Sequence, residues 1–134
     1  MNRIRLAAKQ ENLDKFITVI SNFAEQNDFS PEVIRRIKLS LEEALVNIMN
    51  YAYPENEGEV AVYYRKKSDT ELILEIFDNG ISLNPLSTPK PNFTATLSER
   101  KVGGLGVFFI RKMTEDVHYR RQGDANILTL IYSK

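Results

Sequence analysis

The chain has 134 residues, of which 43% are hydrophobic, so it can bury a core and we expect one folded domain over residues 1–134. Its 18 Lys and Arg residues balance 18 Asp and Glu residues, so net charge provides no general attraction to nucleic acid or to an anionic membrane. The absence of cysteine and the single histidine exclude disulfides, thiolate metal sites and multi-histidine metal sites. No stretch resembles a signal peptide or a membrane span, so a cytoplasmic protein is expected.

The first half of the chain predicts a strand followed by two helices. Polar and apolar residues alternate over residues 3–7, which is typical of a half-buried strand. Apolar residues recur at helical spacing over residues 13–24. Ser30 and Pro31 then supply an N-cap and a first-turn proline, and an apolar stripe continues to Ala52, before Pro54. We therefore expect a second helix over about Pro31–Ala52.

The second half predicts two hairpins separated by a loop and a short helix. Alternation over residues 60–64 and 72–76 surrounds a polar turn, and Asp78-Asn79-Gly80 ends the second strand. Residues 81–102 form a tract rich in Ser, Thr, Asn and Pro, which is typical of a functional lid or of a disordered segment. A helix is predicted over 104–113 and a hairpin pairs 117–121 with 127–132. Grouped helices between sequential hairpins predict an α+β two-layer sandwich.

The second predicted helix carries a first candidate site. At 100° per residue, Glu43 and Asn47 lie about 40° apart on one face. The residues expected roughly opposite them are Ile34, Leu41, Leu45 and Ala52. A carboxylate beside an amide oxygen could act as a general base next to a ligand for Mg²⁺. An ordinary solvated helix face is the alternative.

A second candidate site is the end of the strand that precedes Gly80. A carboxylate there, Asp78, can accept a hydrogen bond from an exocyclic amine, and Gly80 would let a flat ring approach the backbone. The same tripeptide is also a common turn, which is the alternative interpretation.

A third candidate site is the glycine-rich start of the third predicted helix. Gly103, Gly104 and Gly106 lead into it, and a helix start offers free N–H groups to phosphate. Arg100 and Lys101 add positive charge beside it. The pattern matches neither the Walker P-loop nor the dinucleotide fingerprint, and glycines that merely ease a loop into a helix are the alternative.

The order and spacing of the three segments resemble the Bergerat-type ATP-binding fold of the GHKL superfamily, and most closely its bacterial anti-sigma-factor serine kinases. The resemblance implies a mixed, mainly antiparallel sheet with helices on one face, a lid over about residues 81–103, and ATP and Mg²⁺ as cofactors.

The resemblance also implies a role for each matching residue. Asn47 would ligate Mg²⁺, and Glu43 would deprotonate the attacking hydroxyl. Asp78 would accept from the adenine amine with Gly80 beside the ring, and Thr129 would lie near the adenine. The phosphates would be bound by Arg100, Lys101, Gly103, Gly104, Leu105 and Gly106.

The chain departs from the family pattern at two places. Ser82 stands where the second glycine of Asp-x-Gly-x-Gly is expected, and Tyr51-Ala52 stands where His-Gly or His-Ala is common. His118 lies in a predicted strand and is expected to be structural, so it does not suit the phospho-accepting role of a histidine kinase. A transducer domain is not expected after Lys134.

Two functions follow from the resemblance. The first is an ATP-dependent serine/threonine kinase that acts as an anti-sigma factor and phosphorylates a small STAS-type antagonist, with a sigma factor as a further partner and a homodimer as the assembly. The alternative is a non-catalytic, nucleotide-gated binding module of the same fold.

Overall fold

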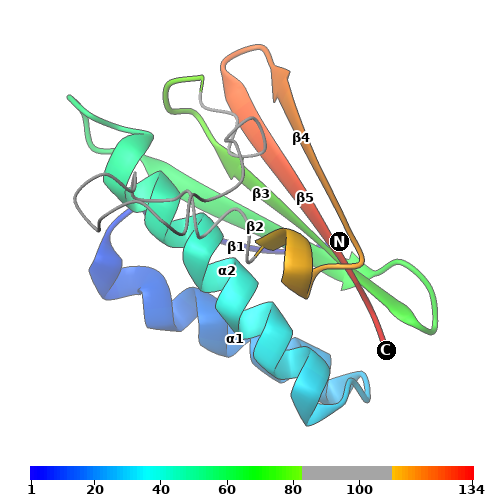
Figure 1. Cartoon of the computed structure of the whole chain (residues 1–134). Helices are drawn as coiled ribbons and strands as arrows, with labels where there is room; N and C mark the ends of the chain where they lie inside the picture. The colour runs from blue at the N-terminus through cyan, green and yellow to red at the C-terminus, as the bar shows by residue number, and fades with distance from the viewer. Residues whose placement is uncertain (83–109) are drawn as a thin grey trace, which may run out of the picture.

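An antiparallel sheet covered on one face by two long helices forms the described part of the protein (Figure 1). The computed structural model describes residues 1–82 and 110–134. Its elements are β1 (Asn2–Ala7), a short 3₁₀ helix (Gln10–Asn12), α1 (Leu13–Gln26), α2 (Pro31–Tyr51), β2 (Glu59–Lys66), β3 (Glu71–Asp78), β4 (Asp116–Gln122) and β5 (Ala125–Ser133). The predicted α+β two-layer sandwich is confirmed.

The strand order is β1-β2-β3-β5-β4, and each of these four pairings is antiparallel. β5 therefore lies in the interior of the sheet, between β3 and β4. This position brings Asn126 opposite Asp78, although the two are far apart in the sequence. The functional site depends on this pairing.

The core lies between the sheet and the helices because each strand turns alternate side chains toward α1 and α2. The buried core includes Phe16, Ile20, Leu41, Leu45, Val60, Val62, Leu72, Leu74, Ile76, Leu128, Leu130 and Tyr132. One polar link crosses it: the hydroxyls of Ser40 on α2 and Tyr132 on β5 are 2.5 Å apart and both side chains are buried. Burial raises the pKa of Tyr132, so this phenol stays protonated.

The sequence predictions of the elements agree with the structure where they can be compared. Ser30 caps α2, because its hydroxyl accepts from the Val33 amide at 3.2 Å. The turn between β4 and β5 has Gly123 at φ 61°, a conformation that glycine adopts without strain. Residues 110–113 are helical, as predicted for 104–113. The remainder of that predicted helix and most of the predicted lid lie outside the described residues. None of the described helices is long and apolar enough to cross a membrane.

Candidate nucleotide site

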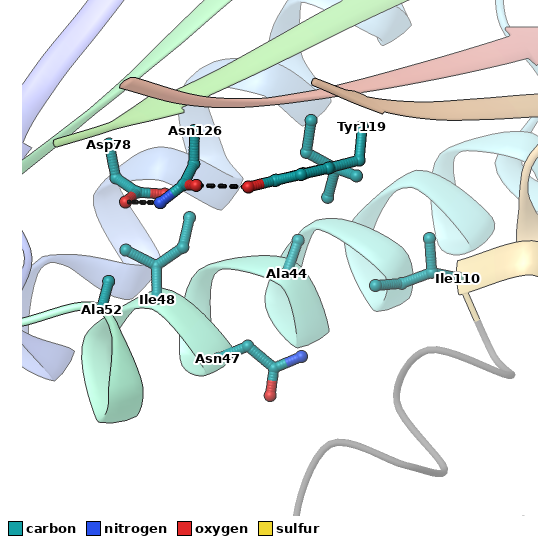
Figure 2. A pocket seen from close by; sticks show the side chains of 9 residues that line it. Ala44, Asn47, Ile48, Ala52, Asp78, Ile110, Tyr119 and Asn126 are labelled. Atoms are coloured by element: carbon teal, nitrogen blue, oxygen red, sulfur yellow. Dashed lines mark hydrogen bonds between the residues drawn. The ribbon is translucent and has the colours of Figure 1, made fainter. Parts of the chain in front are cut away.

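An open cleft separates α2 from the sheet near the C-terminal end of the helix (Figure 2). The cleft is open to solvent, and most of its lining is apolar. The residues that line it are Ala44, Asn47, Ile48, Ala52, Asp78, Ile110, Tyr119, Asn126 and Leu128. Apolar walls with a few polar groups suit a flat, partly polar ligand.

Asp78 lies at the closed end of the cleft and is 6% exposed. Its Oδ1 accepts from the Gly80 amide at 2.9 Å and from Nδ2 of Asn126 at 2.8 Å. Burial raises the pKa of Asp78, while these hydrogen bonds and the charge of Arg121 lower it. Within the described ranges Oδ2 accepts no hydrogen bond, so it is available to a donor on a ligand.

Gly80 is confined by the end of α2. A Cβ at this position would lie 2.2 Å from the carbonyl oxygen of Ala52 and 2.6 Å from its Cβ. The same carbonyl accepts from the Ile81 amide at 2.9 Å. Gly80 does not line the cleft, so the need for glycine here comes from packing between helix and strand end. This differs from the expectation that glycine makes room for a ring.

Asn47 extends from α2 at the mouth of the cleft, away from the sheet (Figure 2). Glu43 lies one turn earlier and is half-buried, but it is not among the lining residues. Burial, followed by the nearby charge of Glu42, raises the pKa of Glu43, which suits a general base better than a fully solvated carboxylate would. Ala52, expected on the opposite side of the helix from Asn47, instead lines the same cleft.

Thr129 is not brought to the site. Side chains alternate along a strand, and Thr129 pairs with Glu75 and His118 on the face that the helices leave uncovered. Asn126, three residues earlier, lies on the cleft face and contacts Asp78. Thr129, expected near the adenine, is therefore on the sheet face opposite the cleft, and Asn126 is the residue of β5 that lies beside Asp78.

The proposed phosphate-binding residues all lie outside the described part of the chain; they are Arg100, Lys101, Gly103, Gly104, Leu105 and Gly106. His118, expected to be structural, is exposed on the sheet face away from the helices, where its Nε2 is 3.0 Å from Asp116 Oδ2. It is therefore remote from the cleft. Across the described residues no group of three metal-ligating side chains is found.

Sequence reasoning missed four residues around the cleft. Tyr119, Arg121 and Asn126 form a polar cluster with Asp78, and Tyr53 joins two strand ends. The Tyr53 hydroxyl donates to the Glu59 carbonyl at 2.6 Å and accepts from the Asn79 amide at 2.8 Å. One signal was available for Asn126: it is a polar residue in the same strand register as the buried Leu128 and Leu130.

Comparison with known proteins places the chain in a family. The model of the histidine kinase-like ATPase domain matches residues 6–132. The chain belongs to this family. The fold also resembles solved structures. The RsbU and RsbW domains of Rv1364c from Mycobacterium tuberculosis match with a TM-score of 0.66 at 10% identity, over 99% of this chain and 32% of that one. A blue-light activated histidine kinase of Erythrobacter litoralis matches with a TM-score of 0.58 at 16% identity, over 90% of this chain and 60% of that one.

Curated relatives of this ATPase-domain protein include serine kinases. Serine-protein kinase RsbW of Listeria innocua is 32% identical over 133 residues, which cover 94% of this chain and 83% of that protein. Serine-protein kinase RsbW of Bacillus cereus strain AH187 is 24% identical, over 96% of this chain and 82% of that protein. The similarity thus extends over nearly the whole chain.

Proposed function

We propose that the protein is an ATP-dependent serine/threonine kinase that acts as an anti-sigma factor and phosphorylates a small STAS-type antagonist protein. The observation that carries the proposal is one cleft with the free acceptor of Asp78 at its closed end and the amide of Asn47 at its mouth. Similarity to serine-protein kinases over 94% of the chain supports the same class of reaction.

The described residues fit an adenine nucleotide. Asp78 would accept from the exocyclic amine of the base, and Leu128 and Ile48 would line the apolar walls beside it. Asn47 would ligate Mg²⁺ through its amide oxygen, since within the described ranges this amide makes no hydrogen bond. Bound Mg²⁺ would supply charge neutralisation on the phosphates. The phosphate contacts are proposed for Arg100, Lys101, Gly103, Gly104, Leu105 and Gly106.

Glu43 is the proposed general base. It would take the proton of the serine hydroxyl as the oxygen attacks the γ-phosphoryl group and ADP leaves. In this proposal the acceptor serine belongs to the antagonist protein. Partial burial raises the pKa of Glu43, which brings it closer to the working pH.

A second candidate function is a nucleotide-gated regulator without transferase activity. The observation that favours it is the position of Glu43 outside the set of residues lining the cleft. In that case a nucleotide would only shift the affinity for a partner protein.

Phosphotransfer assays separate the two functions. We expect Mg-ATP and a STAS-type antagonist to give phosphoserine with the wild-type protein. Glu43→Gln should reduce the transfer rate by about 10² to 10⁴-fold while ATP affinity changes little. The exposed neighbour offers a matched control, Glu42→Gln, which should keep most of the rate. A wild-type protein that binds ATP but never transfers phosphate would contradict the kinase proposal and favour the regulator.

The proposed partners are the antagonist, a sigma factor and a second copy of the chain, in the cytoplasm and without nucleic acid or membrane. On β1 and α1, the apolar side chains of Ile4, Leu6 and Phe16 belong to the core or pack against it, so they do not provide a surface for the proposed homodimer. Sedimentation equilibrium with and without ATP would test the homodimer.

A further inference from the structure

A polar cluster at the closed end of the cleft joins the last hairpin to the turn after β3 (Figure 2). Asn126 of β5 is at its centre and is 5% exposed. Tyr119 and Arg121 reach it from β4, and Asp78 contacts it from β3. None of these contacts is required to form the sheet, because all are made by side chains.

The hydrogen bonds of this cluster define one orientation for the amide of Asn126. Its oxygen accepts from the Tyr119 hydroxyl at 2.5 Å and from Arg121 Nη1 at 3.1 Å. Its nitrogen donates to Asp78 Oδ1 at 2.8 Å and to the Ile81 carbonyl at 2.8 Å. A reversed amide would turn its oxygen toward the carboxylate and the Ile81 carbonyl, and its NH₂ toward the guanidinium. The donors on β4 and the acceptors of Asp78 and Ile81 therefore set the orientation together.

This orientation determines what the cleft offers to a ligand. Both amide protons of Asn126 are used internally, and Asp78 Oδ1 is filled by Asn126 and the Gly80 amide. Among the described residues, what remains at this edge is Asp78 Oδ2, which in the ionised carboxylate can accept a hydrogen bond but cannot donate one. A base with an exocyclic amine at this edge, as in adenine, can donate to it. Guanine presents a carbonyl oxygen at the equivalent edge, and none of the four clustered side chains among the described residues has a donor left to meet it.

We propose that Tyr119 and Arg121 are positioning residues for nucleobase selection: through Asn126 they hold the site in a form that accepts adenine and rejects guanine. The proposal rests on the proposed nucleotide-binding function. Without the two donors only Asp78 and the Ile81 carbonyl hold the Asn126 amide, so Asn126 and the carboxylate that it contacts are less firmly placed and the preference for a base with an exocyclic amine weakens. Arg121 also donates to the Gly80 carbonyl at 2.8 Å, so it steadies the turn beside Asp78 as well.

The test compares Mg-ATP and Mg-GTP affinities, by isothermal titration calorimetry, of the wild type, Tyr119→Phe, Arg121→Met and the double variant. We expect the ratio of the two affinities to fall about tenfold or more in the double variant, an effect the size of one hydrogen bond. Arg121→Lys, which keeps a donor, should restore part of the ratio. Arg120→Met is the matched control: Arg120 lies on the opposite sheet face, 3.8 Å from Glu75, and its loss should leave the ratio unchanged.

A second measurement needs no nucleotide. In the ligand-free protein both side-chain N–H protons of Asn126 are hydrogen-bonded, so NMR should show slow exchange with solvent. The double variant should lose part of this protection, because the amide oxygen has lost its two donors. An unchanged affinity ratio with both affinities reduced alike, or unchanged protection, would overturn the positioning role alone. A wild type that binds neither nucleotide would overturn the proposed function as well, so the two failures are distinguishable.

Discussion

Substituting Gly80 by alanine tests whether this glycine serves packing or ligand approach. The added Cβ would lie 2.2 Å from the Ala52 carbonyl oxygen, which is a backbone atom at the end of α2 and cannot rotate away. The helix end and the strand end must then separate, and the hydrogen bond of 2.9 Å from the Ile81 amide to this carbonyl is weakened or lost. The substitution therefore destabilises the protein whether or not a nucleotide is present.

The magnitude follows from two terms. Overpacking costs about 1–3 kcal/mol, and one lost hydrogen bond adds about 1 kcal/mol, so we expect a loss of about 2–4 kcal/mol. An unfolding entropy of roughly 2.1 cal/mol/K per residue over 134 residues is about 0.28 kcal/mol/K. Each kcal/mol then lowers the Tm by about 3.5 °C, and Gly80→Ala should lower it by about 7–14 °C.

Thermal unfolding followed by far-ultraviolet circular dichroism without ligand is the assay. Gly123→Ala is the control for adding a methyl group elsewhere: nothing lies within 4 Å of its Cβ, and only the positive φ costs about 1 kcal/mol. Combining Gly80→Ala with Ala52→Gly removes the contact of 2.6 Å between the two Cβ atoms. It leaves the contact of 2.2 Å with the carbonyl oxygen of residue 52, so the double variant should regain only part of the lost Tm. A Gly80→Ala protein with the wild-type Tm but without ATP affinity would refute this reasoning and favour ring approach.

Two further predictions concern buried polar groups. Ser40→Ala should lower the free energy of unfolding, measured with urea, by about 1–3 kcal/mol, because it leaves the buried Tyr132 hydroxyl without its partner. Tyr132→Phe should lower it less, since the Ser40 hydroxyl still donates to the Arg36 carbonyl at 2.7 Å. Equal losses in the two variants would contradict this asymmetry. The raised pKa of Asp78 means that the folded protein binds the carboxyl proton more tightly than the unfolded chain does. The stabilisation that this protonation provides is therefore complete below about pH 3.8 and is lost as the pH rises through the raised pKa. The stability of Asp78→Asn relative to the wild type should therefore increase across that interval in urea titrations at successive pH values, and a constant difference would argue against the shift.

The elements of the fold could be predicted because their signals are local. Helical periodicity and alternation depend on residues within a few positions of one another, and both helices and both hairpins were placed within a few residues of their ends. The N-cap at Ser30 and the glycine turn at Gly123 are local in the same sense. Among the residues that line the cleft, Asp78 and Asn47 can be singled out from the sequence because each occupies a characteristic place on one strand or one helix.

The tertiary structure alone decided which distant residues meet. Thr129 and Asn126 are three positions apart, an odd number, so they lie on opposite faces of β5, and only the pairing of β5 with β3 shows which of them reaches Asp78. The constraint on Gly80 comes from Ala52, 28 positions earlier, and no local pattern contains it. The sequence by itself determined the elements, their polar and apolar faces and the acceptor at the end of β3. The neighbours that orient this acceptor come from strand register and helix packing, because these join segments that are remote along the chain.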